Sequence, residues 1–201
     1  MPDRSIPFYN LILKCRDYQP KAAALPEGFS ITPYRRGDER VWAELEFAVG
    51  DFDSVEQAEA YFTAAYMEDL TVCEKRARFL RGRDGNVVGS CIAWKDRRGD
   101  GWVPSLHWLI VDEAPRRRGL GRALCRAVMD IFWENGEFPV YIHTQPWSWQ
   151  AVSLYGSMGF RIQRTDTFSH YTNQYSQAMA ALKAALPEEQ YQYLAKLTED
   201  F

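Results

Sequence analysis

The sequence predicts an α+β fold in which helices flank a mixed, mostly antiparallel central sheet. Strand-like segments joined by short turns fill residues 78–111, a pattern typical of an antiparallel meander. A helix, a strand and a second helix follow in residues 120–158. At 201 residues the chain suits one domain that buries roughly 70% of the surface exposed by its unfolded form.

The first half of the chain provides a strand and two helices ahead of the meander. Residues 29–34 alternate in the strand period, and a helix then begins at Asp38. Residues 51–54 end this helix and cap a second one over residues 55–68. One side of the first helix is apolar and is expected to be buried. It carries Val41, Trp42, Leu45 and Val49.

Turn residues divide the meander and the elements after it. Asp84-Gly85-Asn86 joins two strands of a hairpin, and residues 97–101 lead into a third strand that ends at Val111. Apolar residues then recur at helical spacing from Leu120 until Asn135-Gly136 ends the pattern. A short strand and a short helix complete this half. They cover residues 140–144 and 150–158.

A glycine- and arginine-rich loop precedes the helix that begins at Leu120. Its sequence is Arg116-Arg117-Arg118-Gly119-Leu120-Gly121, which predicts a pyrophosphate-binding loop. Glycines let the backbone approach an anion closely, and the following helix offers unpaired N–H groups and the positive end of its dipole. Arginines add charge-assisted hydrogen bonds. A solvated basic turn would have the same sequence, so the loop alone is a weak indication.

A second motif strengthens the prediction. Together the two motifs resemble the GNAT superfamily of acyl-CoA-dependent N-acetyltransferases. The first signature of that family, Arg/Gln-x-x-Gly-x-Gly/Ala, is matched by Arg116, Gly119 and Gly121. Ser148 stands where the second signature begins with asparagine, so a contact that the family often makes through that amide is shortened or lost. The other positions of this signature, Asn-x-x-Ala-x-x-Leu-Tyr-x-x-x-Gly-Phe, are matched at Ala151, Leu154, Tyr155, Gly159 and Phe160.

The resemblance divides the chain into a core and two extensions. Residues 29–165 correspond to a GNAT acetyltransferase core. Residues 1–28 form an N-terminal extension, in which residues 7–14 are a possible extra strand that could cover an exposed sheet edge. Residues 166–201 form a C-terminal extension of two helices separated by Pro187. These helices suit either a homodimer surface or a cap over the acceptor site.

Charge and composition exclude several classes of protein. The net charge of −3 argues against a nucleic-acid binder, so the arginines suit one phosphorylated ligand. No apolar run approaches a membrane span, and the first residues lack the pattern of a signal peptide, so we expect no membrane partner and a cytoplasmic protein. The four cysteines have no Cys-x-x-Cys spacing and no histidine nearby, which predicts neither a disulfide framework nor a metal site.

The resemblance implies that acetyl-CoA is the cofactor. The end of the last meander strand is expected to pair through its backbone with the pantetheine arm and the thioester oxygen. The arginine-glycine loop would hold the pyrophosphate, and the start of the second motif would add further contacts. The residues are Leu109, Ile110, Val111, Arg116, Arg117, Arg118, Gly119, Leu120, Gly121, Arg122, Ser148 and Ala151.

Acetyl transfer to an amine needs a base for the amine and a proton for the departing thiolate. By resemblance, Tyr155 lies near the cofactor sulfur and donates that proton, although a core aromatic would explain it too. His107 resembles a histidine of arylalkylamine N-acetyltransferases that relays the amine proton. His143 lies on the adjacent strand, where ribosomal-protein N-acetyltransferases carry a catalytic glutamate. Imidazoles titrate in the required range, but either histidine can instead be a hydrogen-bonded core residue.

The acceptor amine is expected to bind the first two helices, the loop between them and two tryptophans of the second motif region. Aromatic rings with nearby carboxylates suit a cationic amine with an apolar body, and equally suit a solvated turn over core aromatics. Polyamines, amino sugars, arylalkylamines and protein N-termini remain open. The expected residues are Phe47, Asp51, Phe52, Asp53, Tyr66, Trp147 and Trp149.

We therefore expect an N-acetyltransferase that moves an acetyl group from acetyl-CoA to a primary amine by direct transfer in a ternary complex. The acceptor would be a small-molecule amine or a peptide N-terminus. The alternative is a non-catalytic acyl-CoA-binding sensor or partner-recruiting module that keeps the loop without turnover. A nucleotide-binding loop of another kind is disfavoured, because the lysine and serine or threonine of a phosphate-cradling NTPase loop are missing.

Overall fold

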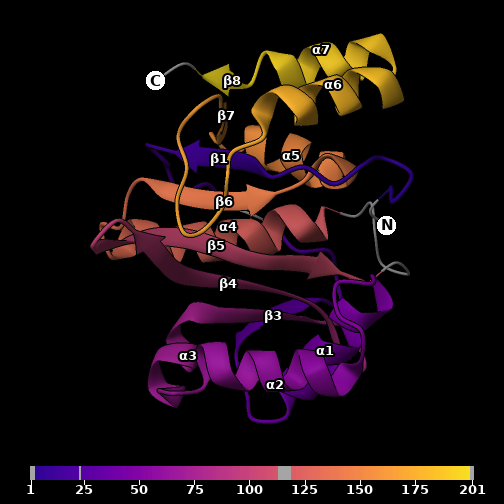
Figure 1. Cartoon of the computed structure of the whole chain (residues 1–201). Coiled ribbons are helices and arrows are strands. Elements are labelled where there is room, and N and C mark those ends of the chain that lie inside the picture. Colours follow the sequence, from indigo (N-terminus) through magenta and orange to yellow (C-terminus); the bar gives the residue numbers. More distant parts are fainter. Residues whose placement is uncertain (1–2, 23, 113–118, 200–201) are drawn as a thin grey trace. The chain divides into compact units, whose positions relative to one another are not determined.

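The computed structural model describes residues 3–22, 24–112 and 119–199 of the chain (Figure 1). Contacts divide the chain into two compact units, each assembled from separate segments. The first unit comprises Met1–Gln19, Lys95–Ser105 and Asn135–Phe201, and the second comprises Pro20–Trp94 and Leu106–Glu134. None of the described helices is long and apolar enough to cross a membrane.

Eight strands form one sheet in the hydrogen-bonded order β2-β3-β4-β5-β6-β1-β7-β8. The strands β4 (Val87–Arg98) and β5 (Gly101–Val111) contribute residues to both units. The recorded pairings are antiparallel except those of β5 with β6 and of β7 with β8. The predicted α+β class, with a mostly antiparallel sheet and added C-terminal helices, is therefore confirmed.

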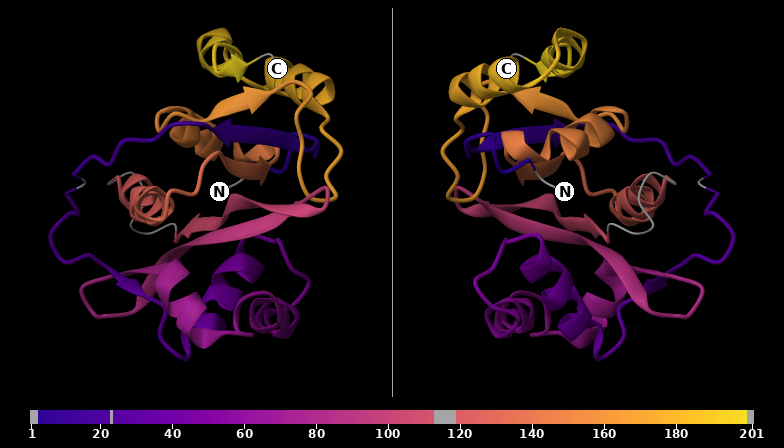
Figure 2. Two further views of the ribbon diagram at one scale, coloured as in Figure 1. Left: turned by 90° about the vertical axis from the view of Figure 1, so that its left-hand side faces the viewer. Right: turned by 90° about the vertical axis from the view of Figure 1, so that its right-hand side faces the viewer.

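In the second unit, helices cover both faces of the strands. Figure 2 shows α1 and α2 on one face and α4 on the other. Side chains from α1, α2 and β3 form a fully buried core that includes Trp42, Phe62 and Phe79. The elements are β2 (Ser30–Pro33), α1 (Asp38–Ala48), α2 (Val55–Tyr66), α3 (Leu70–Arg76), β3 (Ala77–Arg81) and α4 (Leu120–Glu134), together with residues 87–94 of β4 and 106–111 of β5.

The short helix α3 was not predicted, because its segment is charged and has no clear apolar period. Its cap explains why it forms. The Asp69 carboxylate accepts hydrogen bonds from the backbone N–H groups of Thr71 and Val72, at 2.9 and 3.2 Å. These bonds satisfy N–H groups that the first helical turn leaves unpaired.

In the first unit, the N-terminal strand lies inside the sheet. Pairing places β1 between β6 and β7, so the expectation that this strand covers a sheet edge is wrong. Four of the five residues of β1 are apolar and all five are buried, which suits a strand that lies between two others. The elements are β1 (Leu11–Cys15), β6 (Val140–Thr144), η1 (Pro146–Ser148), α5 (Trp149–Gly156), β7 (Arg161–Gln163), α6 (Tyr175–Ala185), α7 (Glu188–Ala195) and β8 (Thr198–Glu199).

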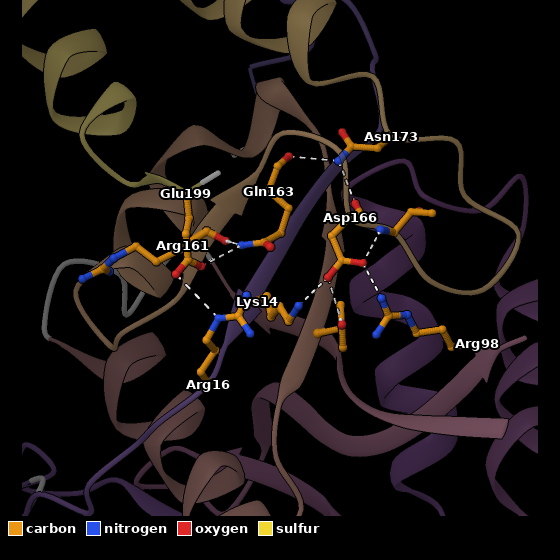
Figure 3. Close-up of polar contacts among 10 residues, drawn as sticks. Lys14, Arg16, Arg98, Arg161, Gln163, Asp166, Asn173 and Glu199 are labelled. Carbon is orange, nitrogen blue, oxygen red and sulfur yellow. Dashed lines mark hydrogen bonds and ion pairs between the residues drawn. The ribbon is translucent and has the colours of Figure 1, made fainter. Parts of the chain in front are cut away.

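One carboxylate ties the segment after β7 to the strands. Asp166 accepts hydrogen bonds from Lys14 of β1 at 2.5 Å, from Arg98 at 2.6 Å and from the Tyr141 hydroxyl at 3.0 Å (Figure 3). The Asn173 amide donates to the Asp166 carbonyl oxygen at 2.8 Å. Because Lys14 is only 6% exposed, this ion pair prevents a buried charge from standing alone. The segment between β7 and α6 is thereby fixed to the sheet.

Candidate active site

A buried tyrosine joins two consecutive residues of β5. Tyr66, the last residue of α2, is 1% exposed, and its hydroxyl oxygen lies 2.7 Å from Nδ1 of His107. The indole N–H of Trp108 donates to the same oxygen at 2.9 Å. Tyr66 therefore accepts from Trp108 and keeps its O–H group and a second lone pair for the imidazole. In the tautomer of His107 whose Nδ1–H donates to Tyr66, the lone pair available for proton exchange is on Nε2.

The backbone beside His107 is strained. Trp108 has a φ angle of 52°, which lies in the left-handed region that bulky residues avoid. A residue held in such a conformation costs on the order of 1–3 kcal/mol, and such residues concentrate at functional sites. The strained residue directly precedes Leu109, Ile110 and Val111, the predicted cofactor-binding end of β5.

The end of β5 is pressed against β4. A Cβ atom on Gly89 would come within 2.6 Å of the carbonyl oxygen of Ile110, so only glycine permits this approach. The backbone N–H of Asp112 also donates to the Val88 carbonyl at 2.8 Å. Ile110 is 7% exposed, while Leu109 and Val111 are half-buried. The predicted cofactor segment is thus held in a fixed position by its neighbouring strand.

The start of α4 has features of an anion site. Gly119 precedes the helix with a φ angle of 77°, and its carbonyl accepts the N–H of Ala123 at 3.0 Å. The first turn contains no acidic residue and carries the exposed Arg122, so it suits the positive end of the helix dipole. Leu120 is 2% exposed and Gly121 is half-buried. The other loop residues of the prediction, Arg116, Arg117 and Arg118, lie outside the described residues.

His143, in the first unit, is a less suitable base than His107. Its ring stacks on Tyr171 with centroids 3.7 Å apart, and its Nε2 lies 2.9 Å from the side-chain oxygen of Asn10. Burial, and then the nearby His170, lowers the pKa of His143 to about 4. The imidazole is therefore neutral near pH 7 and a weak proton acceptor.

Tyr155 lies on α5 and is 5% exposed, with its ring centroid 5.9 Å from that of Phe160. These contacts suit a core aromatic, and they are compatible with a phenol that meets a ligand at one edge. On the same helix, Ala151 is half-buried. Ser148 occupies the N-cap position of α5, but its hydroxyl accepts from the Gln145 amide at 3.1 Å and does not cap the helix.

The two tryptophans predicted to line the acceptor site also lie in the first unit. The guanidinium of Arg4 lies 4.0 Å from the centre of the Trp147 ring, and the Phe8 ring is 5.2 Å from it. Trp149 is half-buried and begins α5. Trp147 therefore already holds a cation of the chain on its ring, which is the contact that a cationic acceptor would seek.

The predicted acceptor residues of the second unit differ in exposure. Phe47, Asp51 and Asp53 are exposed, whereas Phe52 and Tyr66 pack into the interior of the unit. Four rings meet there, and we call them the α1–α2 ring cluster. They belong to Trp42, Phe52, Tyr61 and Trp108.

A buried carboxyl group on α1, the helix that carries Trp42, was missed by the sequence prediction. Glu46 on α1 is 2% exposed, and its Oε1 atom has no hydrogen-bond partner among the described residues. Burial, and then the nearby Asp51 carboxylate, raises the pKa of Glu46 well above its usual value. The available signal was its spacing, since Glu46 follows Trp42 by four residues and so shares a helix face with it.

Comparison with known proteins identifies the family. The model of the Acetyltransferase (GNAT) family matches residues 38–160, which is more than half of the chain. The chain belongs to the GNAT acetyltransferase family. The matched range begins at α1 and ends after α5, so it includes His107, the start of α4 and Tyr155.

Individual relatives are distant. The mycothiol acetyltransferase of Clavibacter michiganensis subsp. michiganensis is 37% identical over 67 residues, which are 30% of this chain and 20% of that protein. A GCN5-related N-acetyltransferase from Sphaerobacter thermophilus superposes with a TM-score of 0.58 at 20% identity, over 79% of this chain and 51% of that one. An aminoglycoside N-acetyltransferase in complex with CoA gives a TM-score of 0.56 at 17% identity, over 75% and 99%. At these identities the superpositions establish the fold.

Proposed function

We propose that the protein is an acetyl-CoA-dependent N-acetyltransferase that transfers the acetyl group directly to a primary amine. The observation that carries this proposal is the arrangement of His107, whose Nδ1 is held by Tyr66 beside the strained Trp108. An imidazole that is held in one orientation is prepared for proton transfer. A histidine that only fills the core needs no such arrangement. Membership of the GNAT family and the CoA complex of a structural neighbour support acetyl-CoA as the donor.

The cofactor would be bound mainly by backbone groups and by the start of α4. Leu109, Ile110 and Val111 would offer backbone N–H and C=O groups to the pantetheine arm. The first turn of α4 and Arg122 would receive the pyrophosphate, together with the three arginines that precede Gly119. Ser148 and Ala151 are proposed to add contacts from the start of α5.

The chemistry requires two proton transfers. His107 would take a proton from the acceptor ammonium at Nε2, in the tautomer whose Nδ1–H donates to the Tyr66 oxygen and whose Nε2 keeps its lone pair. In the imidazolium that forms, Nδ1–H donates to the Tyr66 oxygen, whose two lone pairs can accept both this group and the Trp108 N–H. The neutral amine then forms a bond to the acetyl carbon as the carbon–sulfur bond breaks. Tyr155 would donate the proton that the leaving thiolate takes up.

The test is a panel of primary amines with acetyl-CoA, followed by release of free thiol and detection of the acetylated amine. His107→Gln should lower the rate by about 10²- to 10⁴-fold, the range of positioned acid–base catalysis. The matched control is His170→Gln, because His170 is exposed and has no assigned role. A His107 variant with the full rate would contradict the assignment. Binding of acetyl-CoA without turnover of any amine would favour the non-catalytic alternative.

A further inference from the structure

Two polar atoms on one face of α1 are buried without partners. Besides Oε1 of Glu46, the indole nitrogen of Trp42 has no hydrogen-bond partner among the described residues, and Trp42 is fully buried. Leaving a buried polar atom unpaired is costly, so native proteins rarely do so without a reason. The two residues are four positions apart and therefore neighbours on the helix surface. One atom is a donor and the other an acceptor, which is a combination that a polar ligand can satisfy.

The position of Glu46 makes the cost greater. Glu46 lies in the last turn of α1, where the negative end of the helix dipole disfavours a carboxylate. Asp51 follows the helix, and its backbone N–H donates to the Glu46 carbonyl at 3.1 Å. The negative charge of Asp51, like the helix dipole, disfavours the ionised form of Glu46. A positive ligand would relieve both effects at once.

The α1–α2 ring cluster supplies the apolar part of such a site. Every pair of its four rings has centroids between 5.5 and 6.2 Å apart. Trp42 is fully buried, whereas Tyr61 is 39% exposed, so the cluster extends from the protein interior to the surface. Faces of aromatic rings attract ammonium groups. Trp108 belongs to this cluster and also contacts Tyr66, which connects the cluster to His107.

From these observations we infer that Glu46 and the α1–α2 ring cluster form the recognition site for a primary ammonium group carried on a short apolar body. The inference rests on the proposed function and deepens it by naming the class of acceptor and its anionic partner. Oε1 is buried in the structure, so the side chains that cover it must move aside when the ligand enters. The Trp42 indole N–H remains a donor for an oxygen of the same ligand or for a water molecule that accompanies it.

Binding must also balance the proton of Glu46. Because burial raises the pKa of this carboxyl group, its protonated form is favoured in the free chain, and an arriving ammonium displaces the proton to solvent and leaves an ammonium–carboxylate pair. Binding of an ammonium group therefore releases a proton wherever the free chain holds Glu46 protonated. A neutral ligand of the same shape releases none. This release is a signature that a merely structural glutamate would not give.

The experiment is calorimetric titration of the full chain in the presence of CoA, which does not support transfer. The probes are 2-phenylethylamine, its trimethylammonium analogue and the neutral 2-phenylethanol. Wild-type protein should bind the two cations at least about tenfold more tightly than the alcohol, and Glu46→Gln should remove this preference. Buffers of different ionisation enthalpy, used at mildly acidic pH, should report release of about one proton with each cation in the wild type and none in the variant.

The control is Glu44→Gln, which removes an exposed carboxylate of the same helix that pairs with Arg40. It should leave cation affinity and proton release unchanged. Cation affinity that does not depend on Glu46, or no binding of either cation up to about 10 mM, overturns the inference.

The trimethylammonium probe separates this inference from the proposed function, because it cannot be acetylated. If cations bind through Glu46 but no amine is acetylated, the N-acetyltransferase proposal fails and the recognition site stands. If amines are acetylated with the same KM by the wild type and by Glu46→Gln, only the recognition site fails.

Discussion

The two ends of α1 bury carboxyl groups under opposite conditions. Asp38 lies at the start of the helix, where the dipole favours a negative charge, and accepts two hydrogen bonds from Arg81 at 2.9 and 2.7 Å. Glu46 lies in the last turn beside Asp51, and its Oε1 has no hydrogen-bond partner in the part of the chain that the structure describes. Both residues are less than a tenth exposed. Burial of a carboxyl group therefore says little by itself, whereas the absence of a partner for one oxygen points to a ligand.

The largest expected effect is at the paired end of α1. Asp38→Asn keeps the side-chain size but leaves the guanidinium of Arg81, which is 12% exposed, without its anion. Removing one partner of a buried pair costs about 3–5 kcal/mol of unfolding free energy, measured by urea denaturation. The double variant Asp38→Asn/Arg81→Met should recover part of this loss. A loss below about 1 kcal/mol would mean that the pair behaves as a surface salt bridge.

His143 extends the comparison to a buried base. Its pKa is about 4 in the folded chain against an ordinary value of 6.5, so the unfolded chain binds more protons between these values. The contribution of His143 to the free energy of unfolding is fully present above about pH 6.5. The free energy of unfolding should fall by on the order of 2 kcal/mol as the pH drops towards 4. His143→Asn should flatten this part of the stability curve. Replacing His170 by Gln should flatten it only slightly, because burial rather than His170 is the main cause of the lowered pKa of His143. An unchanged curve in His143→Asn would assign the loss to other groups.

Tyr66→Phe tests whether the network beside the α1–α2 ring cluster acts in catalysis. It removes the oxygen that contacts His107 and Trp108, so kcat should fall by about 10- to 100-fold while the KM for acetyl-CoA stays unchanged. Stability should fall by only about 1–2 kcal/mol, because two hydrogen bonds of about 1 kcal/mol each are lost. Tyr193→Phe, at an exposed tyrosine of α7, is the control. Parallel loss of stability and activity would instead support a structural role.

The smallest expected effect is at the unpaired end of α1. Glu46→Gln should raise the unfolding free energy by about 1 kcal/mol, because it replaces a carboxyl group buried without full pairing. The pKa of Glu46 is raised in the folded chain, so the wild type loses stability as the pH rises through that pKa. The advantage of the variant should therefore grow with pH. Glu44→Gln should change stability little, and a destabilised Glu46→Gln would show that the carboxyl group has a structural partner.

Local patterns in the sequence predicted most of the fold. The helical period of α4 and the turn residues of the meander act over a few positions, so they are readable without tertiary contacts. The helix α3 was missed because its seven residues depend on one cap rather than on an apolar face. The place of β1 was missed because pairing between strands far apart in the chain decides it.

The candidate site was predicted less completely, for a related reason. His107 was recognised by its place on a strand, but its partner Tyr66 stands 41 residues earlier. No local pattern links the two. Glu46 shares a helix face with Trp42, but glutamates are rarely buried, so this spacing alone was not enough to predict its burial. Residues in motifs are thus visible in the sequence, whereas partners brought together by folding are not.

The left-handed backbone of Trp108 has a consequence for the direction of side chains. In a regular strand, neighbouring side chains point to opposite faces, so His107 and Trp108 could not reach one tyrosine. The kink interrupts this alternation and lets Tyr66 contact both. A single dihedral angle thus lets one tyrosine contact both the candidate base and a member of the α1–α2 ring cluster.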